Sequence, residues 1–102
     1  MMEVSASSQE RRLTLRLKGE LDHHGARGLI QRAEQEIDTS LPLQLALDLS
    51  GVTFMDSSGI AVVMRCRQRM RELGGTVTLC HVPAQPRKVF EASGIARLVV
   101  IE

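Results

Sequence analysis

Hydrophobic and polar positions follow two different periods along this chain. Polar and apolar residues alternate over three stretches, which predicts strands with one buried face: residues 12–18, 43–49 (continuing at 52–55) and 76–81. A short apolar run at 98–101 predicts a last strand. Apolar residues that recur every three or four positions predict helices over residues 24–38, 58–73 and 85–92.

The order of these elements indicates the fold class. Strands that alternate with helices form parallel pairs joined by right-handed crossovers, and the result is an α/β sheet covered by helices. The chain has 102 residues, enough for one hydrophobic core, so we expect a single domain over residues 1–102. We expect Gly19 to end the first strand, residues 20–25 to form a connection and residues 1–10 to be loosely held.

Composition and charge exclude several classes of function. The chain carries 13 Lys and Arg against 12 Asp and Glu, a net charge of +1, and Phe54 and Phe90 are its only large aromatic residues. Nucleic-acid binding draws on excess positive charge and aromatic stacking, so we expect no nucleic-acid partner. No apolar run approaches the roughly 20 residues of a membrane span, and the first residues lack the apolar middle of a secretory signal. Two cysteines, Cys66 and Cys80, suit a reducing compartment and are expected to be buried thiols, so we expect a cytoplasmic protein with no membrane partner.

The most informative segment is Met55-Asp56-Ser57-Ser58-Gly59, at the predicted end of a strand and the start of a helix. In open α/β sheets this edge gathers functional groups, and a helix start exposes unpaired N–H groups. Taken alone, the pattern favours simple capping by Asp56 or Ser57, worth about 1 kcal/mol. One cap needs one hydroxyl or carboxylate, however, and three such residues stand in a row.

Catalysis by a serine nucleophile is an alternative interpretation of the same segment. The nucleophile elbow needs a glycine two residues before and two residues after the serine. Gly59 fits after Ser57, but Met55 occupies the preceding glycine position. The sequence identifies no base, although His81 can be proposed as one. A small serine hydrolase is therefore disfavoured.

Two further clusters have ordinary explanations. One cluster that could suggest a metal site consists of Asp22, His23, His24 and His81. The metal-ligand spacings of known sites are absent, and Asp22 is better explained as a helix cap. We therefore expect no metal and no cofactor. Arginines at 65, 67, 69 and 71 spread over both sides of their helix, so most are solvated, with docking of an acidic partner as the alternative.

Two segments carry a resemblance to a known family. Residues 19–24 read Gly-Glu-Leu-Asp-His-His, and residues 47–60 contain Thr-Phe-Met-Asp-Ser-Ser-Gly. Together with residues 73–75 and 89–95, at the expected spacing, they resemble the STAS family over nearly the whole chain, and within it the anti-sigma factor antagonists of sporulation in endospore-forming bacteria. Family members usually continue into a final helix after the last strand, whereas this sequence ends at Glu102.

The resemblance implies a mixed four- to five-stranded sheet with helices on one side, and a regulatory role without catalysis. It implies binding to an anti-sigma factor that is also a serine kinase, release of a sigma factor, inactivation by phosphorylation of Ser57, and restoration by a PP2C-type phosphatase. The implied partner surface comprises Asp22, His23, Asp56, Ser57, Ser58 and Gly59. A STAS module of another signalling complex, in general stress or in nucleotide or lipid sensing, is the alternative.

Overall fold

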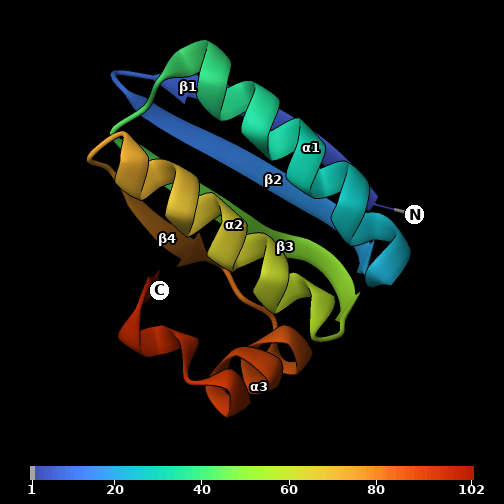
Figure 1. Ribbon diagram of the computed structural model, residues 1–102. Helices are drawn as coiled ribbons and strands as arrows, with labels where there is room; N and C mark the ends of the chain where they lie inside the picture. The colour runs from blue at the N-terminus through green and yellow to red at the C-terminus, as the bar shows by residue number, and fades with distance from the viewer. Residues whose placement is uncertain (1) are drawn as a thin grey trace.

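Five strands pair side by side in chain order in the computed structural model, which describes residues 2–102 (Figure 1). The strands are β1 (Met2–Gln9), β2 (Arg12–Leu21), β3 (Gln44–Met55), β4 (Thr76–Cys80) and β5 (Val100–Ile101). β1 runs antiparallel to β2, whereas β2, β3, β4 and β5 are parallel neighbours. The structure therefore confirms a mixed α/β sheet.

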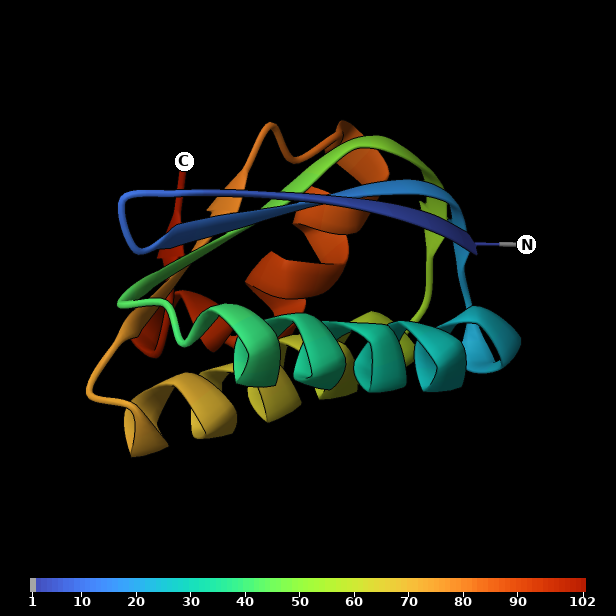
Figure 2. The same ribbon diagram turned by 90° about the horizontal axis from the view of Figure 1, so that it is seen from above.

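All three predicted helices are present, with boundaries shifted by at most two residues. They are α1 (His23–Ser40), α2 (Ser58–Glu72) and α3 (Ala84–Ser93), and a short 3-10 helix, η1 (Ile95–Arg97), follows α3. α1 and α2 lie side by side beneath one face of the sheet (Figure 2).

The hydrophobic core lies between these helices and the sheet. α1 buries one stripe, made of Ala26, Leu29, Ala33 and Ile37. Alternate leucines of β2 and β3 meet it from the sheet: Leu13, Leu15, Leu17, Leu45, Leu47 and Leu49. Phe90 of α3 is fully buried in the same cluster. Burial of apolar side chains stabilises each element mainly through this shared core, at about 1.5–3 kcal/mol per fully buried large side chain.

The N-terminal segment corrects the expectation that residues 1–10 are loosely held. Residue 1 lies outside the described residues, but residues 2–9 form β1 and pair with β2 along their whole length. The connecting turn places Glu10 and Arg11 at φ 51° and 65°, the left-handed pair that suits a two-residue hairpin. The Arg11 guanidinium donates to the Leu41 carbonyl at 2.9 Å, so contacts distant in sequence support this turn.

Two strand boundaries also differ from expectation. Gly19 does not end β2: it adopts φ 111° beside an irregularity in the β2–β3 register, and the strand continues to Leu21. The last strand is shorter than residues 98–101, because Leu98 follows η1 and only Val100–Ile101 pair with β4. The first shift matters for function, because it brings the end of β2 level with the end of β3.

Candidate functional site

β2 and β3 end side by side at one edge of the sheet. Leu21 pairs with Met55 in the parallel register, and the Asp56 N–H donates to the Leu21 carbonyl at 3.3 Å. Asp22 and Asp56 therefore each follow one of two paired residues. The segments that contain the two aspartates are neighbours in space although they lie far apart in sequence.

Asp22 caps α1. Its Oδ1 accepts a hydrogen bond from the Gly25 N–H at 2.8 Å. This bond, helped by the positive charge of nearby His24, outweighs desolvation and lowers the pKa of the Asp22 carboxyl from its ordinary value. The cap at the start of α1 is therefore ionised at neutral pH.

Asp56 performs the equivalent role for α2. Its Oδ1 accepts from the Ser58 N–H at 2.8 Å, and its backbone carbonyl accepts from the Gly59 N–H at 3.0 Å. Ser57 occupies the cap position of α2 with helical backbone angles, but its side chain makes no capping hydrogen bond. Ser57 is exposed, and Ser58 is half-buried. The capping role that sequence analysis assigned to Asp56 or Ser57 thus belongs to Asp56, which leaves the Ser57 hydroxyl free of it.

Gly59 is buried where α2 passes over the end of β3. A Cβ atom at this position would overlap the Met55 side chain and come within 3.2 Å of Leu21 Cδ2. Close approach of the helix to both strand ends therefore requires glycine here. Gly59 sets the position of its exposed neighbours and is itself covered.

Gln85 is a positioning residue that sequence analysis missed. Its side-chain amide accepts from the Met55 N–H and donates to the Met55 carbonyl, both at 2.8 Å. This paired contact from α3 fixes the last residue of β3 immediately before Asp56. No local pattern marks the role of Gln85, because its partner lies thirty positions earlier in the chain.

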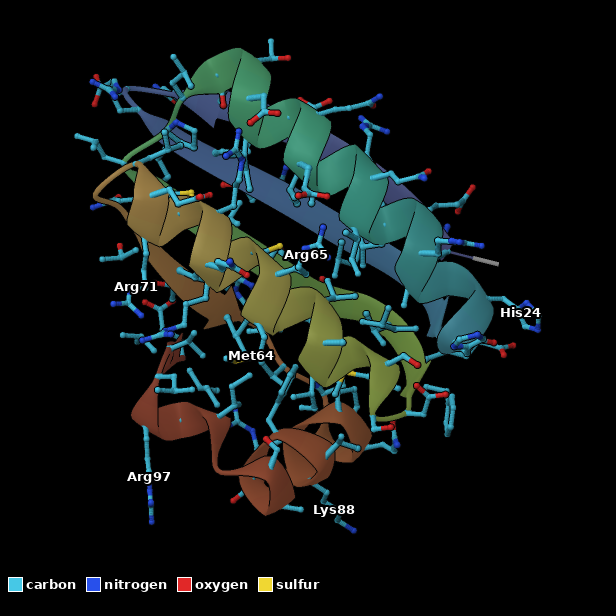
Figure 3. All side chains as sticks on the ribbon, in the orientation of Figure 1. His24, Met64, Arg65, Arg71, Lys88 and Arg97 are labelled. Carbon is cyan, nitrogen blue, oxygen red and sulfur yellow. The ribbon has the colours of Figure 1, made fainter. Side chains whose placement is uncertain are left out.

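An open hollow joins the first turns of α1 and α2. It has a volume of about 660 Å³, and its polar lining comes from His23, His24, Arg27 and Ser58. His23 and His24 are exposed, with ring centroids 6.0 Å apart in an edge-to-face arrangement. His24 projects outward from the beginning of α1 (Figure 3). Residues at both helix starts thus line one continuous surface.

His81 lies elsewhere. Its Nδ1 is 3.5 Å from Asp48 Oδ2, and Asp48 pairs with Cys80 in the middle of the sheet. Asp48 and Met55 are seven positions apart along β3, which is about 23 Å of strand, so His81 is not placed as a base for Ser57. Within residues 2–102, no group of three or more His, Cys, Asp or Glu side chains is arranged to hold a metal ion.

Both cysteines are free and buried, as expected. Burial raises the pKa of the Cys66 thiol to about 12. Burial also raises the pKa of Cys80, assisted by a hydrogen bond from its Sγ to Glu102 Oε1 at 3.5 Å. Neither thiol is a reactive nucleophile in this setting.

Comparison with known proteins identifies the family. Residues 3–102 match the family model of the STAS domain. The chain belongs to the STAS family. Over 83 residues this STAS domain is 31% identical to the anti-sigma F factor antagonist of Lysinibacillus sphaericus, covering 81% of this chain and 71% of the relative.

Solved structures show the same fold. The anti-sigma factor antagonist SpoIIAA in its unphosphorylated form is 25% identical, with a TM-score of 0.84 over 98% of this chain and 88% of SpoIIAA. The phosphorylated form of the Bacillus cell fate determinant SpoIIAA superimposes with a TM-score of 0.74 at 24% identity, over 98% of this chain and 91% of that one. The chain is thus a STAS domain of the anti-sigma factor antagonist type, a family without enzymatic activity. None of its helices within residues 2–102 is long and apolar enough to cross a bilayer.

Proposed function

We propose that this STAS domain binds an anti-sigma factor with serine kinase activity and thereby frees a sporulation sigma factor in the cytoplasm. The binding surface consists of Asp22, His23, Asp56, Ser57 and Ser58, at the paired ends of β2 and β3, and Gly59 sets the position of that surface from beneath. The observation that carries the proposal is Ser57, which is exposed at the start of α2 with a hydroxyl that no capping bond occupies.

The surroundings of Ser57 suit a phosphate acceptor. An exposed hydroxyl at a helix start can enter a kinase cleft without unfolding of the domain. The positive dipole end of α2 tolerates added negative charge, so the helix itself survives phosphorylation. SpoIIAA, the relative with 25% identity, has been solved both without and with phosphate, which supports a modification of this type.

The same phosphate opposes partner binding. Phosphorylation adds about −1.5 to −2 charges, and the capping side chains of Asp22 and Asp56 already lie at this edge of the sheet. An interface that forms around a neutral serine would have to bury that charge without a partner. A PP2C-type phosphatase would restore the neutral surface.

The direct test combines the protein with a candidate anti-sigma kinase and ATP. We expect intact-mass spectrometry to show one added phosphate and fragment-ion spectra to place it on Ser57. Ser58→Ala should still accept the phosphate, whereas Ser57→Ala should not. A phosphate that maps to Ser58, or that persists in Ser57→Ala, would overturn the assignment. A stable complex that forms without phosphate transfer would instead favour a STAS module of another signalling complex.

Asp22→Asn separates partner binding from helix capping. Asparagine caps nearly as well as aspartate, so the free energy of unfolding at pH 7 should change by less than about 1 kcal/mol. Affinity for the anti-sigma factor should fall by about ten-fold, since a charged group of the interface is lost. Titration calorimetry and urea unfolding measure the two effects. Unchanged affinity would leave Asp22 with a capping role alone.

The pH dependence of stability provides an independent check on the Asp22 variant. The pKa of Asp22 is lower in the folded protein than its ordinary value, so its charge stabilises the fold above that ordinary value. This contribution disappears as the pH falls through the folded-state pKa. The Asn variant should lack that part of the acid destabilisation.

A further inference from the structure

A second hollow lies at the opposite end of α2 from Ser57. It has a volume of about 370 Å³ and is bounded by the last turns of α2, the start of β4 and the segment from Ala96 to Val100. The distance from Ser57 to Arg71 along α2 is about 20 Å. The hollow, called here the α2–β5 groove, is therefore separate from the surface around Ser57.

The polar side of the α2–β5 groove is strongly basic. Its lining includes Arg67, Arg71 and Arg97 and contains no carboxylate side chain among the described residues. None of the three arginines forms an ion pair within residues 2–102, whereas Arg65 and Arg69, on the same helix, pair with acidic residues of α1. Arg71 and Arg97 project outward at the two sides of this region (Figure 3).

Arg67 contributes to the shape of the groove as well as to its positive charge. Its Nε donates to the Leu98 carbonyl at 3.2 Å, which ties α2 to the segment before β5. The lining therefore consists of elements that are held together by a hydrogen bond across the groove. The guanidinium nitrogens of Arg71 and Arg97 have no such partner in the described part of the chain and remain free to bind.

The groove also presents apolar surface. Leu98 is 46% exposed and Val100 is 59% exposed, and they are two of the five large apolar side chains exposed in residues 2–102. β5 is an outer strand of the sheet, so its far edge pairs with no other strand of the described chain. An exposed apolar residue on an open strand edge, with a second one just before the strand, favours an extended chain as the ligand.

We propose that the α2–β5 groove is a second docking surface, which takes an extended segment of a partner protein that carries acidic and aliphatic side chains. Carboxylates of the segment pair with the guanidinium groups of Arg71 and Arg97, and its aliphatic side chains cover Leu98 and Val100. Guanidinium groups bind carboxylates in a bidentate geometry, so the contact fixes the orientation of the carboxylate as well as pairing its charge. The surface is independent of Ser57, so a partner there remains bound when Ser57 is phosphorylated.

A protein segment fits these features better than an anionic membrane does. Polybasic membrane sites gather about four to eight Lys or Arg residues on one face. The groove offers three arginines, and one of them is committed to the Leu98 carbonyl. Val100 lies on β5 and Leu98 lies just before it, and both line the hollow, which suits an inserted chain.

Fluorescence anisotropy with a defined probe tests the proposal on the full chain. The probe is a fluorescein-labelled peptide of alternating glutamate and valine, and the matching lysine–valine peptide is its control. We expect saturable binding of the acidic peptide that weakens as salt is added, because exposed charges are screened. Binding of both peptides with equal affinity would show that charge plays no part and would overturn the proposal.

Matched double variants locate the binding site. Arg71→Glu with Arg97→Glu should weaken binding of the acidic peptide by about ten-fold or more. Arg12→Glu with Lys18→Glu makes the same change in net charge on exposed residues of β2 and should shift the affinity by less than about two-fold. Equal weakening in both double variants would mean that net charge alone attracts the peptide. Circular dichroism confirms that both variants remain folded.

Two measurements on the unmodified chain keep the proposal testable if a variant unfolds. Amide chemical shifts should move for Gly75–Val77 and Ala96–Val100 when the acidic peptide is added, and those around Ser57 should not. Phosphatidylserine vesicles serve as the competing ligand. Strong vesicle binding without peptide binding would assign the groove to a membrane surface and contradict a protein partner.

Discussion

Ser57→Asp is expected to weaken binding of the anti-sigma factor by about 10²-fold, and phosphorylation of Ser57 by roughly 10²–10⁴-fold. The physical reason is burial of an unpaired charge, which costs about 3–5 kcal/mol when an interface must desolvate it. A carboxylate carries less charge than a phosphate and has fewer acceptor oxygens, so the substitution gives the smaller effect. Titration calorimetry with purified anti-sigma factor measures both forms.

Two controls separate this effect from a general response to negative charge. Ser57→Ala removes at most one modest hydrogen bond and should bind within a few-fold of the wild-type chain. Ser8→Asp adds the same charge at an exposed position of β1, remote from the ends of β2 and β3, and should leave affinity unchanged. If Ser57→Asp binds as tightly as Ser8→Asp, Ser57 does not lie in the interface.

The elements that sequence analysis predicted well are those with a strong local pattern. α1 and α2 bury one continuous stripe each, and the leucines of β2 and β3 alternate without interruption, so the burial pattern is visible in the sequence itself. β1 lacked such a signal, because Glu10 and Arg11 form its turn where Asn-Gly or Asp-Gly would mark a hairpin. The contact between Arg11 and Leu41 that supports this turn joins residues thirty positions apart, so no local window contains it.

Some features of the candidate site could likewise be predicted from the sequence, and others could not. Sequence analysis placed residues 55–59 at the edge of the sheet, and the family resemblance implied one surface for Asp22 and Ser57. The pairing of Leu21 with Met55 brings the two segments together at that edge. Ser57 is exposed and Ser58 is half-buried, because successive residues of a helix point about 100° apart. The contact of Gln85 with Met55 could not be predicted, because it depends on where α3 docks.

Gly59→Ala should destabilise the fold by about 1–3 kcal/mol, the usual effect of forcing extra volume into a packed core. The added methyl group would overlap the Met55 side chain and press on Leu21 Cδ2 at 3.2 Å. Met55 can yield only in part, since it is fully buried and its backbone is held by Gln85. Urea unfolding monitored by circular dichroism gives the difference in the free energy of unfolding.

Gly28→Ala is the matched control, because it makes the same chemical change inside a helix at an open position. No atom lies within 4 Å of a Cβ placed at Gly28, so the variant should gain about 0.5–1 kcal/mol from the higher helix propensity of alanine. The two variants should therefore shift stability in opposite directions. If Gly59→Ala also stabilised the fold, helix propensity would outweigh the close approach of α2 to the ends of β2 and β3. Gly59 would then not set the position of Ser57, and larger residues at position 59 should leave affinity for the anti-sigma factor intact.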